Sequence, residues 1–186
     1  MHLRPVLLRR FARDERGLSA IEFALILPIM VLLYFGLAEI MLSMMAERRA
    51  GHAASAVGDL VAQSQAGLKD ADIDQILFVG VASMRPFPVA DLSMRVTSVQ
   101  ANPQGTPLVV WSKAQGPSFS KLGNGATVSP FPANLLAAGD SVIMAEVKYS
   151  YANPIMKVIP HTLVFQDVFY LRPRRAAVIT CSDCPP

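Results

Sequence analysis

A run of apolar residues extends from Leu18 to Met45 and contains only two formal charges, Glu22 and Glu39. As a helix rising about 1.5 Å per residue, this run would be ~42 Å long. The hydrocarbon of a bilayer is ~30 Å thick, so the run is long enough to cross a membrane. The pattern therefore predicts a transmembrane helix over residues 18–45.

Two residues inside this predicted helix are unusual for a membrane environment. Pro28 has no backbone N–H, so it predicts either a static kink or a turn that melts locally. Glu39 lies ~26 Å along a helix from Glu22, which places the two carboxylates near opposite interfaces. We expect Glu39 either to reach the outer headgroups or to contact a partner helix.

Small residues then recur at every fourth position, which predicts that the helix continues beyond the membrane. It forms either a packed stalk or, as we favour, a helix lying on the sheet of its own domain. Gly67 is the expected end of this helix. The recurring residues are Ala46, Ala50, Ala54, Gly58, Ala62 and Ala66.

A second, shorter helix is expected to begin near Asp70, because Asp72 and Gln75 have the spacing of a capping box. Asp70, Asp72 and Asp74 also resemble the start of a calcium loop, but the glycine and the closing glutamate of such a loop are missing. Pro86 and Pro88 end the helix. Its apolar face would consist of Ile73, Ile76, Leu77, Gly80, Val81 and Met84.

The rest of the chain reads as β-strands separated by turn residues. Residues alternate between apolar and polar along Ser141–Tyr151, which is typical of an antiparallel sheet with one covered face. Between Gln115 and Gly139 lies a long loop with Leu122, Phe131 and Leu135 expected to pack on the core, and its length could carry a binding surface. The predicted strands are Leu92–Gln100, Leu108–Ala114, Ser141–Tyr151, Leu163–Leu171 and Ala176–Thr180. The predicted fold class is α+β, with an antiparallel sheet of four or five strands.

The positive charge of the chain is concentrated in its first 17 residues, which hold five arginines against two acids. Such a cluster holds an N-terminus in the cytoplasm, so residues 46–186 are expected across the membrane. Beyond Gly17 there are 12 basic and 12 acidic residues, and no electrostatic footprint for nucleic acid remains. The apolar run also exceeds the core of a cleavable secretory signal, which favours a permanent membrane segment.

We expect no enzyme activity, no cofactor and no metal site, because the sequence contains no catalytic or metal-ligand motif at the required spacing. The three histidines are scattered at His2, His52 and His161. Cys181 and Cys184 form the one chemically specific pattern. Outside the membrane, where thiols are oxidised, a short-loop disulfide is favoured over a redox or metal pair and over two free thiols.

The start of the apolar run resembles the cleavage site of type IV prepilins, most closely in the Flp/Tad branch. That site consists of a glycine, four residues, a glutamate and then a tyrosine or phenylalanine, and here it reads Gly17-Leu18-Ser19-Ala20-Ile21-Glu22-Phe23. The resemblance implies cleavage between Gly17 and Leu18, which makes Glu22 the fifth residue of the mature chain. In that family this glutamate is thought to pair with the free amine of a neighbouring subunit, here that of Leu18. The alternative is a glutamate kept near the headgroups.

A longer block is similar to the N-terminal signature of TadE-like minor pseudopilins. It consists of Glu22-Phe23-Ala24-Leu25-Ile26-Leu27-Pro28 followed by Gly36-Leu37-Ala38-Glu39. Phe23 in place of the usual tyrosine, together with a large C-terminal domain, separates this chain from the major Flp pilin. The resemblance implies a cytoplasmic leader over 1–17, a membrane helix over 18–45 and a pilin-like extracytoplasmic domain over 46–186.

The function implied by this resemblance is that of a minor pseudopilin in the assembly of a Flp/Tad-type adhesion pilus. Its expected partners are a prepilin peptidase, other minor pilins, the pilus assembly platform and membrane lipid. The expected location is the bacterial inner membrane, with a single pass, a cytoplasmic N-terminus and a C-terminal domain in the periplasm or on the pilus. The alternative is a permanently anchored periplasmic binding or scaffold protein that is neither cleaved nor assembled.

Overall fold

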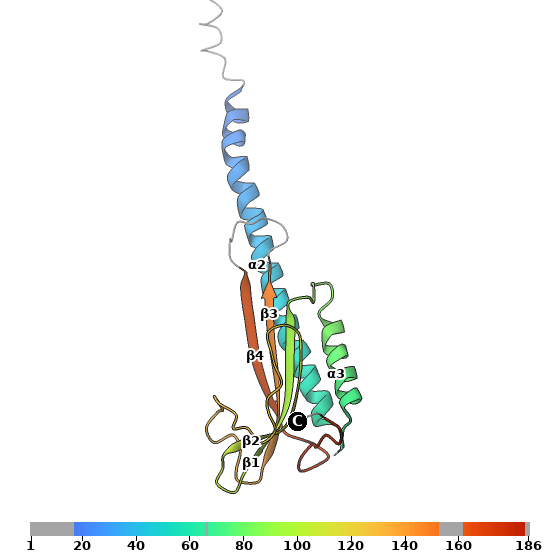
Figure 1. The fold of residues 1–186 in the computed structure, drawn as a ribbon. Helices are drawn as coiled ribbons and strands as arrows, with labels where there is room; N and C mark the ends of the chain where they lie inside the picture. Colours follow the sequence, from blue (N-terminus) through green and yellow to red (C-terminus); the bar gives the residue numbers. More distant parts are fainter. Residues whose placement is uncertain (1–16, 66, 153–161, 185–186) are drawn as a thin grey trace, which may run out of the picture.

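The computed structural model describes residues 17–65, 67–152 and 162–184. A long N-terminal helix, a short helix and a four-stranded antiparallel sheet make up the fold, so the α+β prediction is confirmed (Figure 1). The strands lie in the order β2-β1-β3-β4. The elements are α2 (Leu18–Ala62), α3 (Asp70–Ser83), β1 (Leu92–Ala101), β2 (Pro107–Gln115), β3 (Ser141–Tyr151) and β4 (Leu163–Leu171).

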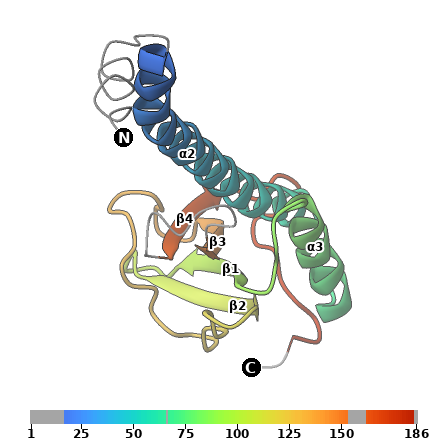
Figure 2. The ribbon, with the colours of Figure 1, turned by 90° about the horizontal axis from the view of Figure 1, so that it is seen from above.

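The C-terminal half of α2 packs on β3 and β4, with α3 beside it (Figure 2). The recurring small residues face the sheet, and Ala46, Ala50 and Ala54 are each at most 1% exposed. At Gly58 the helix lies so close to the sheet that a Cβ there would be 2.6 Å from Leu171 Cδ1 and 3.0 Å from Ala145 Cβ. The favoured alternative, a helix lying on the sheet of its own domain, is therefore confirmed.

The long helix ends at Ala62, and Gln63 is its C-cap. The prediction that Gly67 ends the helix was wrong, and Ala66 lies outside the described residues. The Arg174 backbone N–H donates to the Ala62 carbonyl at 2.9 Å, so a segment distant in sequence takes one of the last free carbonyls. Gly67 has a φ of 86°, a conformation that glycine adopts readily, and lies in the connection to α3.

The short helix α3 begins at Asp70, as predicted, but the residues that cap its N-terminus differ from the predicted ones. Lys69 is the N-cap and Asp72 is the third residue of α3, with its carboxylate accepting the Lys69 backbone N–H at 3.2 Å. The predicted capping box from Asp72 to Gln75 was therefore wrong by one turn. The predicted apolar face is correct at its centre, since Ile73 and Leu77 are fully buried.

Four of the five predicted strands are present, and β3 and β4 have the predicted bounds. The segment Ala176–Thr180 forms no strand, which corrects the fifth prediction. Ile179 is fully buried, and its carbonyl accepts the Trp111 indole N–H at 2.8 Å and the Ser98 hydroxyl at 2.9 Å. Because side chains satisfy this carbonyl, the segment is buried without a neighbouring strand.

The expectation of a single covered face was wrong for the start of β3. Val142 and Met144 point away from α2 and form a second buried cluster with residues of β1, β2 and the long loop. Leu122, Phe131 and Leu136 of that loop pack against it, so Leu136 takes the place expected for Leu135. The loop also covers the outer edge of β2, where Val109 N–H donates to the Ala126 carbonyl at 2.9 Å.

Candidate functional site

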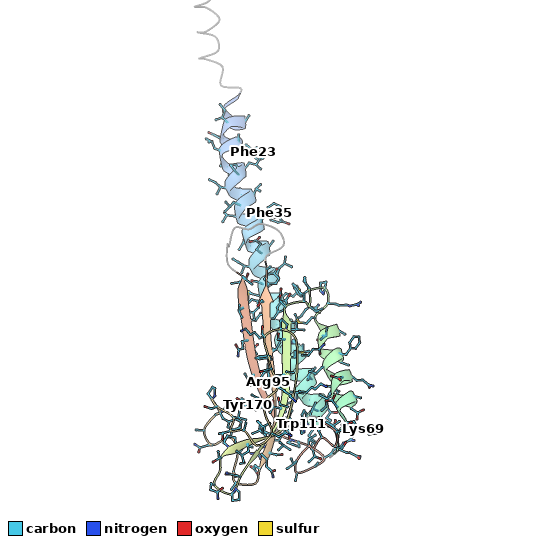
Figure 3. The ribbon with its side chains drawn as sticks, in the orientation of Figure 1. Phe23, Phe35, Lys69, Arg95, Trp111 and Tyr170 are labelled. Carbon is cyan, nitrogen blue, oxygen red and sulfur yellow. A yellow bond between two sulfur atoms is a disulfide. The ribbon has the colours of Figure 1, made fainter. Side chains whose placement is uncertain are left out.

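The N-terminal half of α2 carries large apolar side chains that nothing in the described chain covers. Phe23 is 64% exposed and Tyr34 is 70% exposed, and Figure 3 shows this part of the helix projecting beyond the domain. From Leu18 to Ala38 the helix is about 31 Å long, close to the thickness of bilayer hydrocarbon. Among the described residues, α2 alone is long and apolar enough to cross a membrane.

We call Leu18–Ala38 the bare helix half. Gly17 is its N-cap, with φ −97° and ψ −2°. These angles are open to any residue. No atom lies within 4 Å of the position that a Cβ would occupy, so packing does not require a glycine either. The fold therefore leaves the identity of this residue unexplained. The other residues of the predicted leader, 1–16, lie outside the described residues.

The other residues of the predicted cleavage site follow within the first turns of α2. Leu18 is the first helical residue, and its side chain lies outside what the structure describes. Glu22 and Phe23 are both exposed. Positions 18 and 22 differ by one helical turn and share one side of the helix. Within the part of the chain that the structure describes, Glu22 forms no ion pair.

The two unusual residues of the apolar run have different surroundings. The helix continues without a break through the exposed Pro28, and the Ala24 carbonyl four residues earlier loses its usual donor there. Glu39 is only 1% exposed, so the prediction that it reaches the outer headgroups was wrong. Burial raises the pKa of the Tyr151 hydroxyl on β3, and the charge of Glu39 raises it further, so Glu39 lies close to its own domain. The part of α2 that packs against the domain therefore includes Glu39 and is not confined to residues from 46 onward.

The comparison with known families finds one match, and it covers this helix. Residues 17–59 match the model of the family described as TadE-like protein. This segment is TadE-like.

The TadE-like segment takes in the predicted cleavage site, the bare half of α2 and most of its packed half. The match is consistent with a TadE-like protein of the Flp/Tad system, and the family suggests a protein associated with the Tad pilus. The sheet lies outside the matched residues. No curated protein matches the chain, and no solved structure matches it either.

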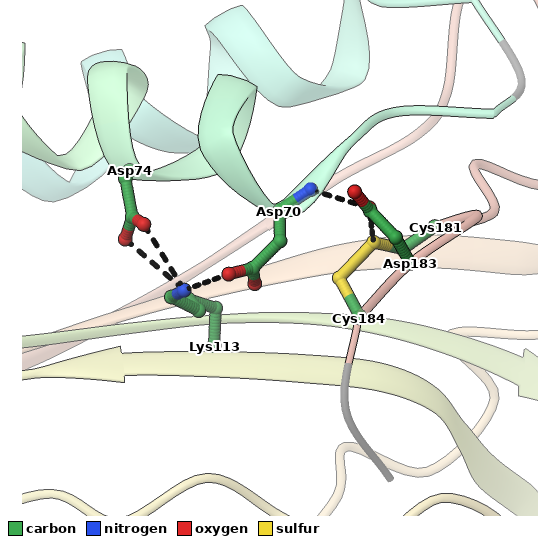
Figure 4. Close-up of polar contacts among 6 residues, drawn as sticks. All are labelled: Asp70, Asp74, Lys113, Cys181, Asp183 and Cys184. Carbon is green, nitrogen blue, oxygen red and sulfur yellow. Dashed lines mark hydrogen bonds and ion pairs between the residues drawn. A yellow bond between two sulfur atoms is a disulfide. The ribbon is translucent and has the colours of Figure 1, made fainter.

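Beyond the TadE-like segment, the predicted disulfide between Cys181 and Cys184 is present, with the two Cα atoms 5.5 Å apart. Its loop holds the C-terminal tail against the start of α3 (Figure 4). Asp183 Oδ1 accepts the Asp70 backbone N–H at 2.7 Å, and Ser182 N–H donates to the Leu68 carbonyl at 2.9 Å. The disulfide loop therefore caps a helix whose sequence position is more than a hundred residues away.

Lys113 on β2 binds the same helix end from the sheet side. Its Nζ lies 2.6 Å from Asp70 Oδ2 and 3.2 Å from the carboxylate of Asp74 (Figure 4). Burial disfavours the charged form of Lys113, but the hydrogen bonds to Asp70 and Asp74 outweigh that effect, so its pKa is raised. The spacing of the two acids on one face of α3 was visible in the sequence, whereas their partner was not.

A second ion pair was missed because its members lie on neighbouring strands. Arg95 Nε and Nη2 donate to the two carboxylate oxygens of Glu146 at 2.5 and 2.8 Å. The same guanidinium donates to the Ser120 carbonyl at 3.1 Å and lies 4.9 Å from the ring centre of Phe119. The pair therefore fastens the long loop to the sheet, and a cavity of about 330 Å³ adjoins it.

Proposed function

We propose that this protein is a minor pseudopilin that takes part in the assembly of a Tad-type adhesion pilus. A prepilin peptidase would cleave the bond between Gly17 and Leu18 and so remove the basic leader. The observation that carries the proposal is the TadE-like segment, which begins at an unconstrained glycine and continues into a bare apolar helix. The leader holds the N-terminus in the cytoplasm, and the domain lies on the other side of the membrane.

The start of α2 suits both cleavage and later pairing. The bond to be hydrolysed lies where the helix begins, and Gly17 presents no side chain to the peptidase. Hydrolysis releases the Gly17 carboxylate and leaves a free amine on Leu18. That amine is positively charged at the positive end of the helix dipole, so an acidic partner is favourable. Glu22 of a neighbouring subunit would supply such a partner within the apolar surroundings of packed helices.

The bare helix half needs an apolar environment at each stage of assembly. Lipid would cover it in the inner membrane, and the helices of other minor pilins would cover it after an assembly platform extracts the subunit. The packed half keeps its contacts with the sheet in both states, because Ala46 to Gly58 already approach their own domain closely. The domain therefore travels as a unit with its helix.

The first test is cleavage of the Gly17→Trp variant by an active prepilin peptidase. We expect the wild-type chain to lose the mass of residues 1–17 and to begin at Leu18 on N-terminal sequencing, while Gly17→Trp stays at full length. Gly17→Ala keeps a small residue and should still be cleaved. Gly36→Trp adds the same bulk to the bare helix, where no atom lies within 4 Å of a Cβ, and should also be cleaved.

A wild-type chain that keeps its leader in the presence of a peptidase active on another substrate would overturn the proposal. That result would favour the permanently anchored scaffold protein. Cleavage of Gly17→Trp at the usual bond would show that the small residue is not recognised.

The second test concerns Glu22→Gln, which keeps the shape of the side chain and removes its charge. We expect this variant to insert into the membrane and to be cleaved nearly as well as wild type, since the bond lies four residues upstream. Co-purification with other pilus subunits should be lost, because the amine of the neighbouring subunit has no carboxylate to pair with. Glu47→Gln, an exposed glutamate on the same helix, is the matched control and should assemble. Normal assembly of Glu22→Gln would show that the charge does not determine pairing.

A further inference from the structure

The sheet has two edges, and only one of them is covered by the residues that the structure describes. Beside β2 the long loop continues the ladder, since Val109 N–H donates to the Ala126 carbonyl at 2.9 Å. Val128 N–H likewise donates to the Pro107 carbonyl at 3.1 Å. β4 forms the opposite edge (Figure 2) and pairs only with β3 among the described residues. Its outward backbone N–H and C=O groups are therefore open to another strand.

β4 lacks most of the features by which edge strands prevent such pairing. Its nine residues include no proline and no lysine, and its register with β3 is regular. The one charged residue, Asp167, is half-buried on the α2 side of the sheet, where its Oδ2 would lie 3.2 Å from a Cβ at Gly51. A single inward charge leaves the edge open but restricts the strands that can pair with it, because a like charge directly opposite is unfavourable.

A hollow lies against each face of β4. On the α2 side, a groove of about 550 Å³ between α2 and β4 contains Asp167. On the other side, a cavity of about 330 Å³ contains Gln166, Val168 and Tyr170. Side chains of an added strand alternate between the two faces, so they would reach both hollows. Backbone pairing combined with pockets for alternate side chains is a common way for a sheet edge to recognise a peptide.

A second copy of this chain does not fit the β4 edge, an argument that rests on the membrane span of the proposed function. Antiparallel pairing of two β4 strands reverses one copy. Because α2 runs alongside the strands (Figure 1), the two membrane segments would then point in opposite directions. Parallel pairing brings the same backbone groups face to face, and the one-residue shift that restores the ladder removes the two-fold symmetry of a closed dimer. The long loop blocks pairing of β4 with β2 of another copy.

We propose that the β4 edge binds an extended segment of a different extracytoplasmic protein, which joins the four-stranded sheet as an additional strand. Asp167 selects arginine or lysine directly opposite, and the half-buried Phe165 and Phe169 select apolar side chains on the same face. The groove also holds Glu47 and Arg48, so its acids outnumber its arginine and favour the same basic side chain. The recognised pattern is apolar, any residue, basic, any residue, apolar. This pattern reads the same in both strand directions.

The test uses the full chain in detergent and the fluorescent peptide acetyl-Thr-Val-Val-Thr-Arg-Thr-Val-Val-Thr-amide. We expect its anisotropy to rise on binding, and the amides of Leu163–Leu171 to exchange more slowly while those of β2 do not change. Glutamate in place of the central arginine should weaken binding about tenfold, because two carboxylates then face each other.

Variants of the chain locate the charge that selects the peptide. Asp167→Asn keeps the shape of the side chain and should remove most of the preference for arginine over glutamate. Asp167→Lys should reverse that preference, with the buried Trp111 reporting that the domain is folded. Asp91→Asn removes an exposed carboxylate before β1 and should bind both peptides as wild type does.

Methylation of peptide nitrogens distinguishes strand addition from binding through side chains alone. Methyl groups on the alternate residues whose N–H groups face β4 should abolish binding, whereas methyl groups on the other residues should not. Equal effects of the two methylated sets, or no protection of the β4 amides, would overturn the proposal. Equal binding of the arginine and glutamate peptides to wild type would overturn the role of Asp167.

A dimer of the chain alone, seen in sedimentation together with protected β4 amides, would show that a second copy occupies the edge. Absence of peptide binding would overturn the proposed docking edge and leave the proposed function intact, because these measurements use the chain before cleavage. Failure of the proposed function would instead appear as a leader that the prepilin peptidase does not remove.

Discussion

The two halves of α2 belong to one continuous helix and yet have opposite surroundings. From Ser19 to Ala38 the helix carries leucine, isoleucine and aromatic side chains on every side, and all of these except the half-buried Phe35 are exposed. From Glu39 to Ala62 the side facing the sheet carries alanine and glycine, and these residues are buried. The halves differ in charge, because the packed half carries exposed charged residues such as Glu47 and Arg48 whereas the bare half carries only Glu22. They differ also in side-chain size, because small residues on the side that faces the sheet let the helix backbone approach β3 and β4 closely.

The strongest test of this comparison replaces one glycine in each half of α2 with leucine. Gly58→Leu should lower the free energy of unfolding of the domain by about 2–3 kcal/mol, because its Cβ would already meet Ala145 and Leu171. Gly36→Leu should leave it unchanged, since nothing lies within 4 Å of a Cβ there. Urea unfolding in detergent, followed by the emission of the single Trp111, measures the domain alone, because this tryptophan is buried on β2.

Equal unfolding midpoints for Gly58→Leu and Gly36→Leu would show that the packed half of α2 does not need its small residues. A lower midpoint for Gly36→Leu would show that the bare half also contacts the domain. Either result would contradict the division of α2 into two environments.

A smaller effect is expected from removing the disulfide, which acts on the packed part of the molecule only. Replacing Cys181 and Cys184 with serine should lower the free energy of unfolding by less than about 2 kcal/mol, because the closed loop is short. The amide of Asp70 should exchange faster, since Asp183 would no longer be held as its acceptor. Asp183→Ala keeps the disulfide and should affect the same amide. Protection of that amide in both variants would show that the tail does not cap α3.

The smallest expected effect is a loss of stability at alkaline pH that again involves the domain and not the bare helix. Burial raises the pKa of Tyr149 and Tyr170, and hydrogen bonds to Asp70 and Asp74 raise that of Lys113 against the opposing effect of burial. A raised pKa stabilises the folded state below the unfolded value of about 10, and this stabilisation is lost as the pH rises through the folded value.

The urea midpoint of the domain should therefore fall between about pH 9 and about pH 11. The fall should be smaller in Lys113→Met, which has no ammonium group to lose. A fall of the same size in Lys113→Met and wild type would show that its ion pair does not contribute to the pH dependence.

The parts of the fold that depend on local pattern could be predicted from the sequence. The alternation along Ser141–Tyr151 gave the bounds of β3, and the fourfold spacing of small residues predicted a packed helix. The burial of Glu39 against its own domain could not be inferred. The residues around a carboxylate in an apolar run do not indicate whether lipid, a partner helix or the protein's own sheet covers it. The motif around Gly17 predicted a cleavage site. The structure shows only that packing does not require a glycine at this position, and cleavage itself stays a prediction.

Features that join distant segments could not be predicted. Ile179 is buried although its segment is no strand, because the Trp111 indole and the Ser98 hydroxyl bind its carbonyl. At the end of α2 the Arg174 backbone N–H similarly binds the Ala62 carbonyl, and the helix ends before Gly67, the glycine on which the prediction rested. In each case the deciding partner lies far away in the sequence, where spacing carries no information about contact.

The continuity of α2 has a mechanical consequence. A helix of 45 residues has no hinge between the part that would cross a membrane and the part fastened to the sheet. The axis of the membrane segment therefore sets the direction in which the domain points, and rotation or traction applied at one end is transmitted to the other. A tilt of about 20° would move the far end of α2 sideways by ~12 Å over its last 24 residues. The orientation of the domain therefore depends directly on the tilt and rotation of its membrane segment.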